Sequence, residues 1–149
     1  MYSIRETQDF YPLSLLYQES GLEVTPGHTP PQGTLAMLRC EDSETGELVA
    51  AATLQHRAGH FVLAHLAVVS HLQGGGVGSQ LLASAEHHAK QLGARELWLV
   101  GKVPGFYARY QWHTVPREMA PPISRCLTCS QFQVDCFPSI MKKELSFEV

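Results

Sequence analysis

The sequence lacks a long apolar run. Its longest apolar stretches fall far short of the roughly 20 residues that a membrane-spanning helix needs. The N-terminal stretch Met1–Asp9 is mostly polar and contains no signal-peptide core. We therefore expect no membrane partner and a cytoplasmic location, where thiols stay reduced.

A surplus of charge is missing as well. The chain has 11 Lys and Arg residues against 14 Asp and Glu residues, so its formal net charge is −3. Proteins that bind nucleic acid through its phosphates concentrate positive charge, so we expect no nucleic-acid partner. Repeats and linker-like segments are also absent, and 149 residues are enough to bury one core. We expect a single domain over residues 1–149.

Glycine is concentrated in one stretch, Gln73-Gly-Gly-Gly-Val-Gly-Ser79. An apolar run, Phe61–Val69, precedes it and has so little alternation that a central strand buried on both faces is predicted. An amphipathic helix follows the glycine stretch and is expected to end at Gly93. Its apolar face consists of Val77, Leu81, Leu82, Ala85, Ala89 and Leu92. Glycine lets the backbone turn tightly and leaves room for a ligand, and the first N–H groups of a helix attract anions. The stretch therefore predicts a phosphate site, because a plain surface turn needs only one or two glycines.

Two common phosphate motifs do not fit this stretch. The P-loop requires Lys and then Ser or Thr after its last glycine, but Gly78 is followed by Ser79 and Gln80. The dinucleotide fingerprint requires glycine at its sixth position, and counting from Gly74 or Gly76 that position holds Ser79 or Leu81.

The order of the predicted elements defines the fold class. Strands are predicted at Tyr2–Arg5, Leu35–Cys40, Leu48–His56, Phe61–Val69, Glu96–Val100, His113–Val115 and Ile140–Leu145, and helices from the N-cap Asp9 to Gly21, from Gly76 to Gly93 and over Pro104–Tyr110. The Pro- and Gly-rich loop Leu22–Gly33 is either a mobile connector or a functional segment. The strand that follows the second helix is expected to run parallel to Phe61–Val69. This order predicts an α/β fold with a mixed, mostly antiparallel central sheet, one parallel βαβ crossover and flanking helices.

The spacing Gln73-x-x-Gly76-x-Gly78 resembles the Gln/Arg-x-x-Gly-x-Gly/Ala motif of the GNAT superfamily of N-acetyltransferases. The downstream pair Phe106-Tyr107 resembles the aromatic-Tyr pair of the same family, and the resemblance covers about 48–112. It implies acetyl-CoA as cosubstrate, with the pyrophosphate on backbone N–H groups of the glycine turn and the pantetheine arm on the edge of the central strand. The implied cofactor-binding residues are Leu66, Ala67, Val68, Gln73, Gly74, Gly75, Gly76, Val77, Gly78 and Ser79.

The resemblance also assigns catalytic candidates. Tyr107 matches the family's general acid, and a phenol of pKa near 10 can protonate a leaving thiolate whose pKa is near 8.5. Tyr110, one helical turn on, and a purely structural Tyr107 are the alternatives. The family often uses a glutamate base on the central strands, but no Asp or Glu lies between Glu47 and Glu86.

Three histidines occupy that interval, His56, His60 and His65. An imidazole of pKa near 6.5 can accept a proton at neutral pH. His65 lies within the central strand beside the expected pantetheine edge and is our candidate base, against the alternative of a structural histidine in the core. A second departure from the family is Gln111-Trp112 in place of Gly-Phe, which predicts a changed turn and a Trp in place of the core Phe.

The cysteines permit three interpretations. Cys126-x-x-Cys129 and Cys136 lie in the loop before the last strand. The fourth ligand of a zinc site there would have to be Cys40 or His113. A single Cys-x-x-Cys pair is a weak zinc signal, so free thiols are favoured over a structural metal or a disulfide, and we assign no metal ligand.

Two functions are carried forward. The first is an acetyl-CoA-dependent N-acetyltransferase that transfers acetyl directly, in a ternary complex, to a primary amine of a small molecule or amino acid. The second is a CoA-binding sensor or scaffold module with a Cys-based metal site. Some members of the family are dimers, so a homodimer is left open. The stretch Pro116–Ile123 bears a similarity to amino-acid acetyltransferases such as N-acetylglutamate synthase that is too loose to assign a substrate.

Overall fold

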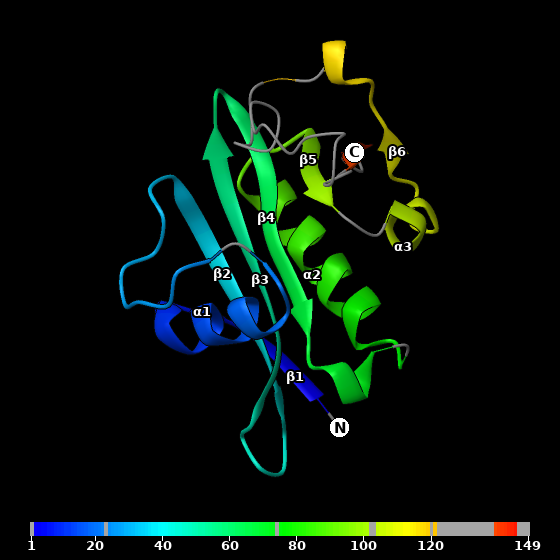
Figure 1. The fold of residues 1–149 in the computed structure, drawn as a ribbon. Helices are drawn as coiled ribbons and strands as arrows, with labels where there is room; N and C mark the ends of the chain where they lie inside the picture. Colours follow the sequence, from blue (N-terminus) through cyan, green and yellow to red (C-terminus); the bar gives the residue numbers. More distant parts are fainter. Residues whose placement is uncertain are drawn as a thin grey trace.

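A mixed sheet with one helix on each face forms the body of the protein (Figure 1). The computed structural model describes residues 2–22, 24–73, 75–101, 104–119, 121 and 139–145. The elements are β1 (Tyr2–Thr7), α1 (Phe10–Glu19), β2 (Thr34–Asp42), β3 (Leu48–Arg57), β4 (His60–Val68), η1 (Ser70–Leu72), α2 (Val77–Gln91), β5 (Glu96–Gly101), α3 (Pro104–Ala108), β6 (His113–Thr114), η2 (Arg117–Met119) and β7 (Ser139–Glu144). Gly74 and the three cysteines Cys126, Cys129 and Cys136 lie outside the described residues.

The described strands are arranged in the order β1-β2-β3-β4-β5-β7-β6. All neighbours are antiparallel except β4 and β5, which are parallel and are joined through α2. The predicted α/β fold, with its mostly antiparallel sheet and single parallel crossover, is therefore confirmed. No helix in the described part of the chain combines the length and the apolarity that a membrane crossing requires.

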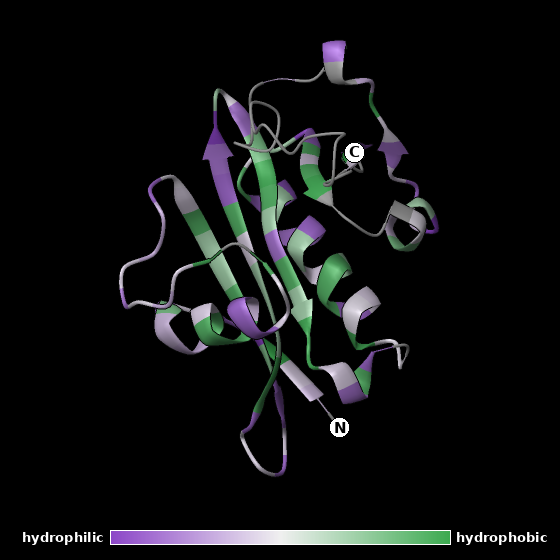
Figure 2. Cartoon of the chain, in the orientation of Figure 1, coloured by the Kyte–Doolittle hydropathy of each residue, from purple (hydrophilic) through white to green (hydrophobic). Residues whose placement is uncertain are grey.

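The two long helices cover opposite faces of the sheet. Met37 and Ala51 belong to the core cluster under α1, whereas the next residues, Leu38 and Ala52, belong to the cluster under α2. This alternation follows from the period of two residues in a strand. The hydropathy colouring shows hydrophobic residues along β3, β4 and α2 (Figure 2), and residues of all three elements belong to one core cluster.

Capping residues set the ends of the helices. The Asp9 carboxylate accepts a hydrogen bond of 3.4 Å from the N–H of Tyr11, as its N-cap role predicts. Gly93, at φ +97°, follows α2 and stops it, which is also as predicted. The placement of Leu92 on the buried face was wrong: it lies beyond the last turn of α2 and is 45% exposed, whereas the other five predicted residues are buried.

The turn after α3 has a glycine-like backbone at Gln111. Gln111 has φ +71°, in the left-handed region that costs an L-residue roughly 1–2 kcal/mol. Gln111 therefore adopts a conformation that glycine favours, and a turn changed relative to the family stays a prediction. Trp112 is 3% exposed and lies in the core, as predicted for the residue that replaces the family's Phe.

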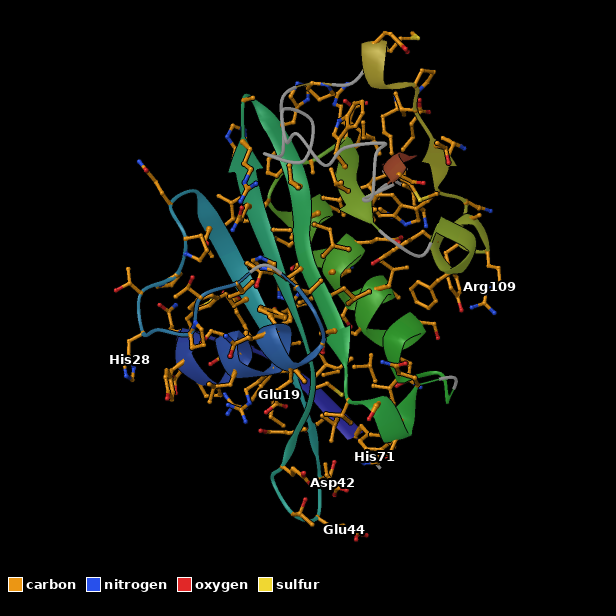
Figure 3. The ribbon with its side chains drawn as sticks, viewed as in Figure 1. Glu19, His28, Asp42, Glu44, His71 and Arg109 are labelled. Carbon is orange, nitrogen blue, oxygen red and sulfur yellow. The ribbon has the colours of Figure 1, made fainter. Side chains whose placement is uncertain are left out.

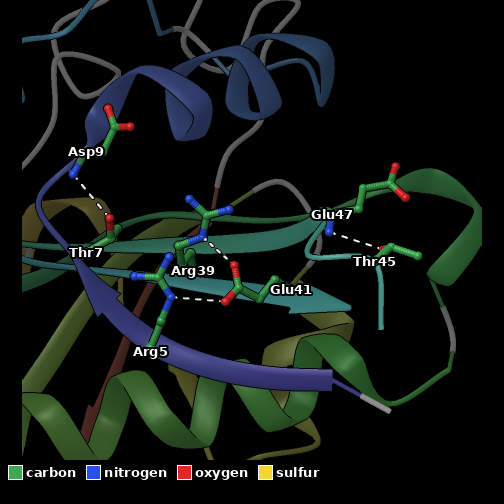
Figure 4. A network of polar contacts seen from close by, with 7 residues as sticks. All are labelled: Arg5, Thr7, Asp9, Arg39, Glu41, Thr45 and Glu47. Carbon is green, nitrogen blue, oxygen red and sulfur yellow. Dashed lines mark hydrogen bonds and ion pairs between the residues drawn. The ribbon is translucent and has the colours of Figure 1, made fainter. Parts of the chain in front are cut away.

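A charged group stabilises the edge of the sheet at β1 and β2. The carboxylate of Glu41 contacts the guanidinium nitrogens of Arg5 at 3.0 Å and of Arg39 at 3.1 Å (Figure 4). The hydrogen bond from Arg5 is the main reason that the pKa of Glu41 is lowered. Nearby, the Thr7 hydroxyl accepts a hydrogen bond of 3.1 Å from the N–H of Asp9 and fixes the entry into α1.

Candidate active site

The parallel strands β4 and β5 separate soon after they meet. Within the residues that the structure describes, they pair at Val62 and Trp98 alone. On its other side β4 stays paired with β3 as far as Val68. One edge of the second half of β4 therefore has backbone groups without a strand neighbour, and such groups are available to a ligand.

A bulge in β4 coincides with this separation. Thr53 opposes His65 but the next residue, Leu54, opposes Leu63, so Ala64 is an extra residue on β4. After the bulge, Leu66 and Val68 pack against the core under α2, and Ala67 lies in the core under α1. β4 is a central strand as predicted, although only Val62, Leu63 and Ala67 of it are buried.

The glycine turn joins the end of β4 to the start of α2. The Gln73 side chain donates a hydrogen bond of 3.1 Å from Nε2 to the carbonyl oxygen of Val68, which ties the turn to the strand. Gly76 caps α2 with φ +90°, a conformation that L side chains rarely adopt, and a Cβ atom there would meet nothing within 4 Å.

The first turn of α2 lies where the sequence predicts an anion site. Val77, Gly78 and Ser79 begin the helix, so their N–H groups have no acceptor within it and lie at the positive end of its dipole. The Ser79 hydroxyl donates to the carbonyl oxygen of Gly76 at 2.9 Å, and the Gly75 N–H donates to that of Leu72 at 3.2 Å. These two bonds stabilise the turn itself, so the helix N–H groups remain for a phosphate.

Three predicted segments meet at Gly78. A Cβ atom on Gly78 would lie 3.5 Å from a side-chain carbon of Val68 on β4 and 3.5 Å from the ring of Phe106 on α3. The end of the unpaired edge, the start of α2 and the aromatic pair are therefore in contact distance of one another. Arg109 extends outward beside α3 with its guanidinium carbon 5.7 Å from the Phe106 ring centre, while His71 lies in η1 before the glycine turn (Figure 3).

Tyr107 lies in the core on the α2 side. It is 8% exposed, and its ring centre is 5.0 Å from that of Phe106 and 5.9 Å from that of Trp112. Burial raises the pKa of Tyr107 from its ordinary value of 10 to about 12. The phenol is therefore protonated over the whole physiological range. Tyr110, the alternative, is half-buried against Phe106.

His65 lies on the opposite face of the sheet. Its ring centre is 4.6 Å from that of Tyr17 on α1, and its Nδ1 atom is buried without a hydrogen-bond partner. Burial, with a smaller effect from the charge of Arg57, lowers the pKa of His65 from 6.5 to about 4. The ring is therefore neutral at pH 7.

The two other histidines of this interval lie elsewhere. His56 is exposed and contacts Phe61, and His60 packs edge-on against Trp98 at 5.7 Å between ring centres. Neither of these two makes a ring contact with α1. Among the described residues, no group of three His, Cys, Asp or Glu side chains is placed to hold a metal ion.

One polar residue of this region was passed over by the sequence analysis. Gln55 lies on β3 opposite Val62, is 0% exposed, and neither atom of its amide has a hydrogen-bond partner. Its signal in the sequence is a polar residue inside the apolar strand Leu48–His56, in alternation with Ala51 and Thr53, which are both buried.

A splayed parallel strand pair, with a glycine turn and a helix N-terminus at its open end, is typical of the class of proteins that bind a phosphate-bearing ligand along a strand edge. Comparison with known families agrees with this class. The model of the acetyltransferase (GNAT) family matches residues 2–110, and the chain belongs to that family, whose cosubstrate is acetyl-CoA. The predicted resemblance is thereby confirmed.

Solved structures show the same fold. N-acetylglutamate synthase from Neisseria gonorrhoeae, in complex with coenzyme A and N-acetyl-glutamate, matches with a TM-score of 0.77 and 22% identity over 99% of this chain and 36% of that one. An acyl-CoA N-acyltransferase described as putative, from Klebsiella pneumoniae, matches with a TM-score of 0.69 and 22% identity, over 98% of this chain and 99% of that one. The ribosomal-protein-S18-alanine N-acetyltransferase of Escherichia coli matches with a TM-score of 0.68 and 17% identity, over 100% of this chain and 97% of that one. The chain thus spans about a third of the length of the synthase, and comparison with curated proteins gave no match.

Proposed function

We propose that the chain transfers the acetyl group of acetyl-CoA directly to a primary amine of a small molecule or amino acid. The observation that carries the proposal is the unpaired edge of β4, which starts after Val62 and leads to the free N–H groups of α2. Pantetheine has amides that can pair with such an edge, and a pyrophosphate suits a helix N-terminus. In this proposal residues 1–149 act as one acetyltransferase domain.

Roles follow for the cofactor-binding residues. Backbone groups of Leu66, Ala67 and Val68 would bind the pantetheine arm. Those of the glycine turn, from Gln73 to Ser79, would bind the pyrophosphate, with Gly76 leaving the space that a side chain would otherwise fill. The side chain of Gln73 would hold the two parts together through its bond to Val68.

The catalytic candidates lie on opposite faces of the sheet. Tyr107 belongs to the core on the α2 side, whereas His65 packs against α1. In the proposed reaction the amine nitrogen attacks the thioester carbon from the α1 side, the new C–N bond forms, and the C–S bond breaks toward Tyr107. The phenol donates its proton, or a hydrogen bond, to the departing sulfur.

His65 is proposed to accept the proton that the amine nitrogen loses. A pKa of about 4 makes the imidazole a weak base. It is sufficient only because a nitrogen that has already attacked a thioester is far more acidic than a free ammonium ion. The amine must therefore bind in its neutral form, and the proton must pass on to water.

The proposal is tested by following the release of free CoA thiol from acetyl-CoA with a panel of amines and amino acids. We expect turnover with at least one class of acceptor, at a rate that depends on both substrates in the way a ternary complex requires. Tight binding of CoA without turnover on any amine would contradict catalysis and favour a binding module.

A further inference from the structure

A largely buried ion pair joins α2 to β7. The Nζ atom of Lys143 on β7 lies 2.6 Å from the Oε1 atom of Glu86 on α2, and the two side chains are only 17% and 14% exposed. Met141, two residues before Lys143 on the same strand, is buried in the core on the α2 side. The attraction within a buried ion pair roughly offsets the cost of removing its two charges from water, so the pair contributes little to stability. Its presence here calls for another explanation.

The second oxygen of the Glu86 carboxylate has a separate partner. Trp112 donates a hydrogen bond of 3.2 Å from Nε1 to Oε2 of Glu86. The Trp112 side chain is 3% exposed, and Nε1–H is the only donor that an indole has. A hydrogen bond to an ionised acceptor is stronger than one between neutral groups, and Lys143 holds this acceptor at its other oxygen. Glu86 therefore fixes the orientation of the Trp112 ring.

The Trp112 ring is one of two rings that hold Tyr107. The ring centres of Trp112 and Tyr107 are 5.9 Å apart, with the planes at 63°, and Phe106 contacts Tyr107 at 5.0 Å. The backbone N–H of Trp112 also donates to the carbonyl oxygen of Tyr107 at 3.3 Å. Among the residues that the structure describes, none forms a hydrogen bond with the Tyr107 hydroxyl. Ring packing and the backbone therefore set the direction of that hydroxyl.

The backbone between Tyr107 and Trp112 is strained. Gln111 has φ +71°, in the left-handed region that L-residues rarely adopt. Such conformations persist where the surrounding structure over-determines them, and they cluster at functional sites. The strained turn brings Trp112 back against Tyr107, so it makes the contact between the two rings possible.

We propose, on the basis of the acetyl transfer proposed above, that Glu86 is a positioning residue for the general acid. Its carboxylate, held by Lys143, orients the Trp112 ring. That ring in turn directs the Tyr107 hydroxyl toward the departing sulfur. Glu86 itself contacts neither the thioester nor the amine.

The chain contains a matched control on the other face of β7. Trp98 on β5 donates a hydrogen bond of 3.1 Å from Nε1 to Oε1 of Glu96, and Nζ of Lys142 lies 3.6 Å from Oε2 of Glu96. The same three residue types are thus joined in the same way, and consecutive residues of a strand point to opposite faces. Trp98 belongs to a separate apolar cluster, whereas Tyr107 belongs to the cluster under α2. Removing this second ion pair should therefore leave the general acid undisturbed.

The test replaces each ion pair by an apolar pair. Glu86→Leu combined with Lys143→Met removes the acceptor of the indole hydrogen bond and leaves no charge buried alone, an exchange that is often neutral for stability. Glu96→Leu combined with Lys142→Met is the control. Glu86→Gln is the conservative variant, because its amide oxygen can still accept the hydrogen bond. Thermal unfolding checks that each variant folds, and Trp112→Phe, which removes the N–H and keeps an aromatic ring, is the substitute if the first pair of changes does not.

We expect the Glu86–Lys143 double variant to lower kcat about 10-fold, because a small change in the direction of a catalytic group slows the chemical step. Its Kd for acetyl-CoA should stay within about 2-fold of wild type. Glu86→Gln should keep kcat within about 3-fold, and the control should keep it within about 2-fold. In a Tyr107→Phe background the same double change should have no further effect on kcat, because it acts through that hydroxyl.

Three kinetic results would overturn the assignment of Glu86. The first is an unchanged kcat in the Glu86–Lys143 double variant. The second is a loss of equal size in the control. The third is a full further loss in the Tyr107→Phe background, which would mean that Glu86 acts by another route.

An NMR measurement separates this inference from the proposed function, because it requires no turnover. The chain has two tryptophans, so its nitrogen–proton spectrum contains two indole signals. The Glu86 double variant should shift the indole signal of Trp112 and the ring signals of Tyr107, whereas the Glu96 control should shift only the indole signal of Trp98. Shifted Tyr107 signals in a protein that transfers no acetyl group would support the coupling of Glu86 to Tyr107 and contradict only the proposed function. Unshifted Tyr107 signals would contradict the inference, whether or not transfer occurs.

Discussion

Replacing Tyr107 by Phe removes one hydroxyl group and leaves the ring. The contacts of the ring with Phe106 and Trp112 are preserved, so the fold should lose at most about 1 kcal/mol. If Tyr107 is the general acid, the effect appears in turnover and not in the affinity for acetyl-CoA. The expected size of that effect follows from the pKa of the phenol.

The pKa of Tyr107 is raised to about 12, whereas that of a thiol is about 8.5. Complete transfer of the proton from the phenol to the thiolate is therefore uphill by roughly 5 kcal/mol, at 1.36 kcal/mol for each pKa unit. Tyr107 should act mainly by donating a hydrogen bond as negative charge develops on the sulfur. We therefore expect a loss near the low end of the range for general acids, about 100-fold in kcat, or ~2.7 kcal/mol.

The assay is steady-state turnover of Tyr107→Phe, together with the Kd for acetyl-CoA from calorimetry. Tyr110→Phe is the matched control, because Tyr110 contacts the same Phe106 ring from one helical turn away. An unchanged kcat in Tyr107→Phe would refute the acid role. A large loss in the control instead would transfer that role to Tyr110.

Further predictions concern pH, the glycine turn and one hairpin. Activity requires a protonated Tyr107, whose raised pKa moves the loss of activity at high pH toward pH 12. Activity also requires a neutral His65, whose lowered pKa moves the loss of activity at low pH toward pH 4. Between about pH 6 and 10, kcat/KM should therefore rise only as the amine loses its proton. A fall in kcat/KM near about pH 8 to 9 would contradict these pKa directions. Gly78→Ala places a methyl group in ordinary contact at 3.5 Å and should stabilise α2 by about 0.5–1 kcal/mol in thermal unfolding. Gly76→Ala, at φ +90°, should cost about 1–2 kcal/mol and weaken CoA binding in calorimetry, and normal binding would remove the turn from the phosphate site. Ala58, at φ +50° before Gly59 at +83°, occupies a turn that prefers Asn-Gly, so Ala58→Asn should add up to about 1 kcal/mol, or roughly 2–4 °C in Tm; a lower Tm would contradict this assignment of the turn.

Much of the fold could be predicted because the apolar periodicity is strong and the turns carry their own markers. Asp9 and Gly93 mark helix ends by side-chain capping and by positive φ, both of which depend on residue type alone. Leu92 shows where apolar periodicity fails as a guide. The periodic pattern extends to Leu92, but α2 ends at Gln91, so Leu92 no longer lies on the buried face of the helix.

The features that shape the candidate site were harder to predict. The bulge at Ala64 and the separation of β4 from β5 arise from strand register, and no glycine or proline marks either of them. Gln111 adopts a backbone that its residue type does not favour, because its neighbours on either side are held by packing. The isolation of the Gln55 amide depends on which side chains lie around it, so it too could be recognised only in three dimensions.

The central claim is that the strand edge after Val62 and the helix N–H groups after Gly76 together hold the acyl carrier. A crystal structure with bound CoA tests it most directly. We predict the pyrophosphate within hydrogen-bond distance of the N–H groups of Val77, Gly78 and Ser79, and the pantetheine amides paired with the β4 backbone at 66–68. CoA bound at another place, with this strand edge and helix terminus unoccupied, would contradict the account.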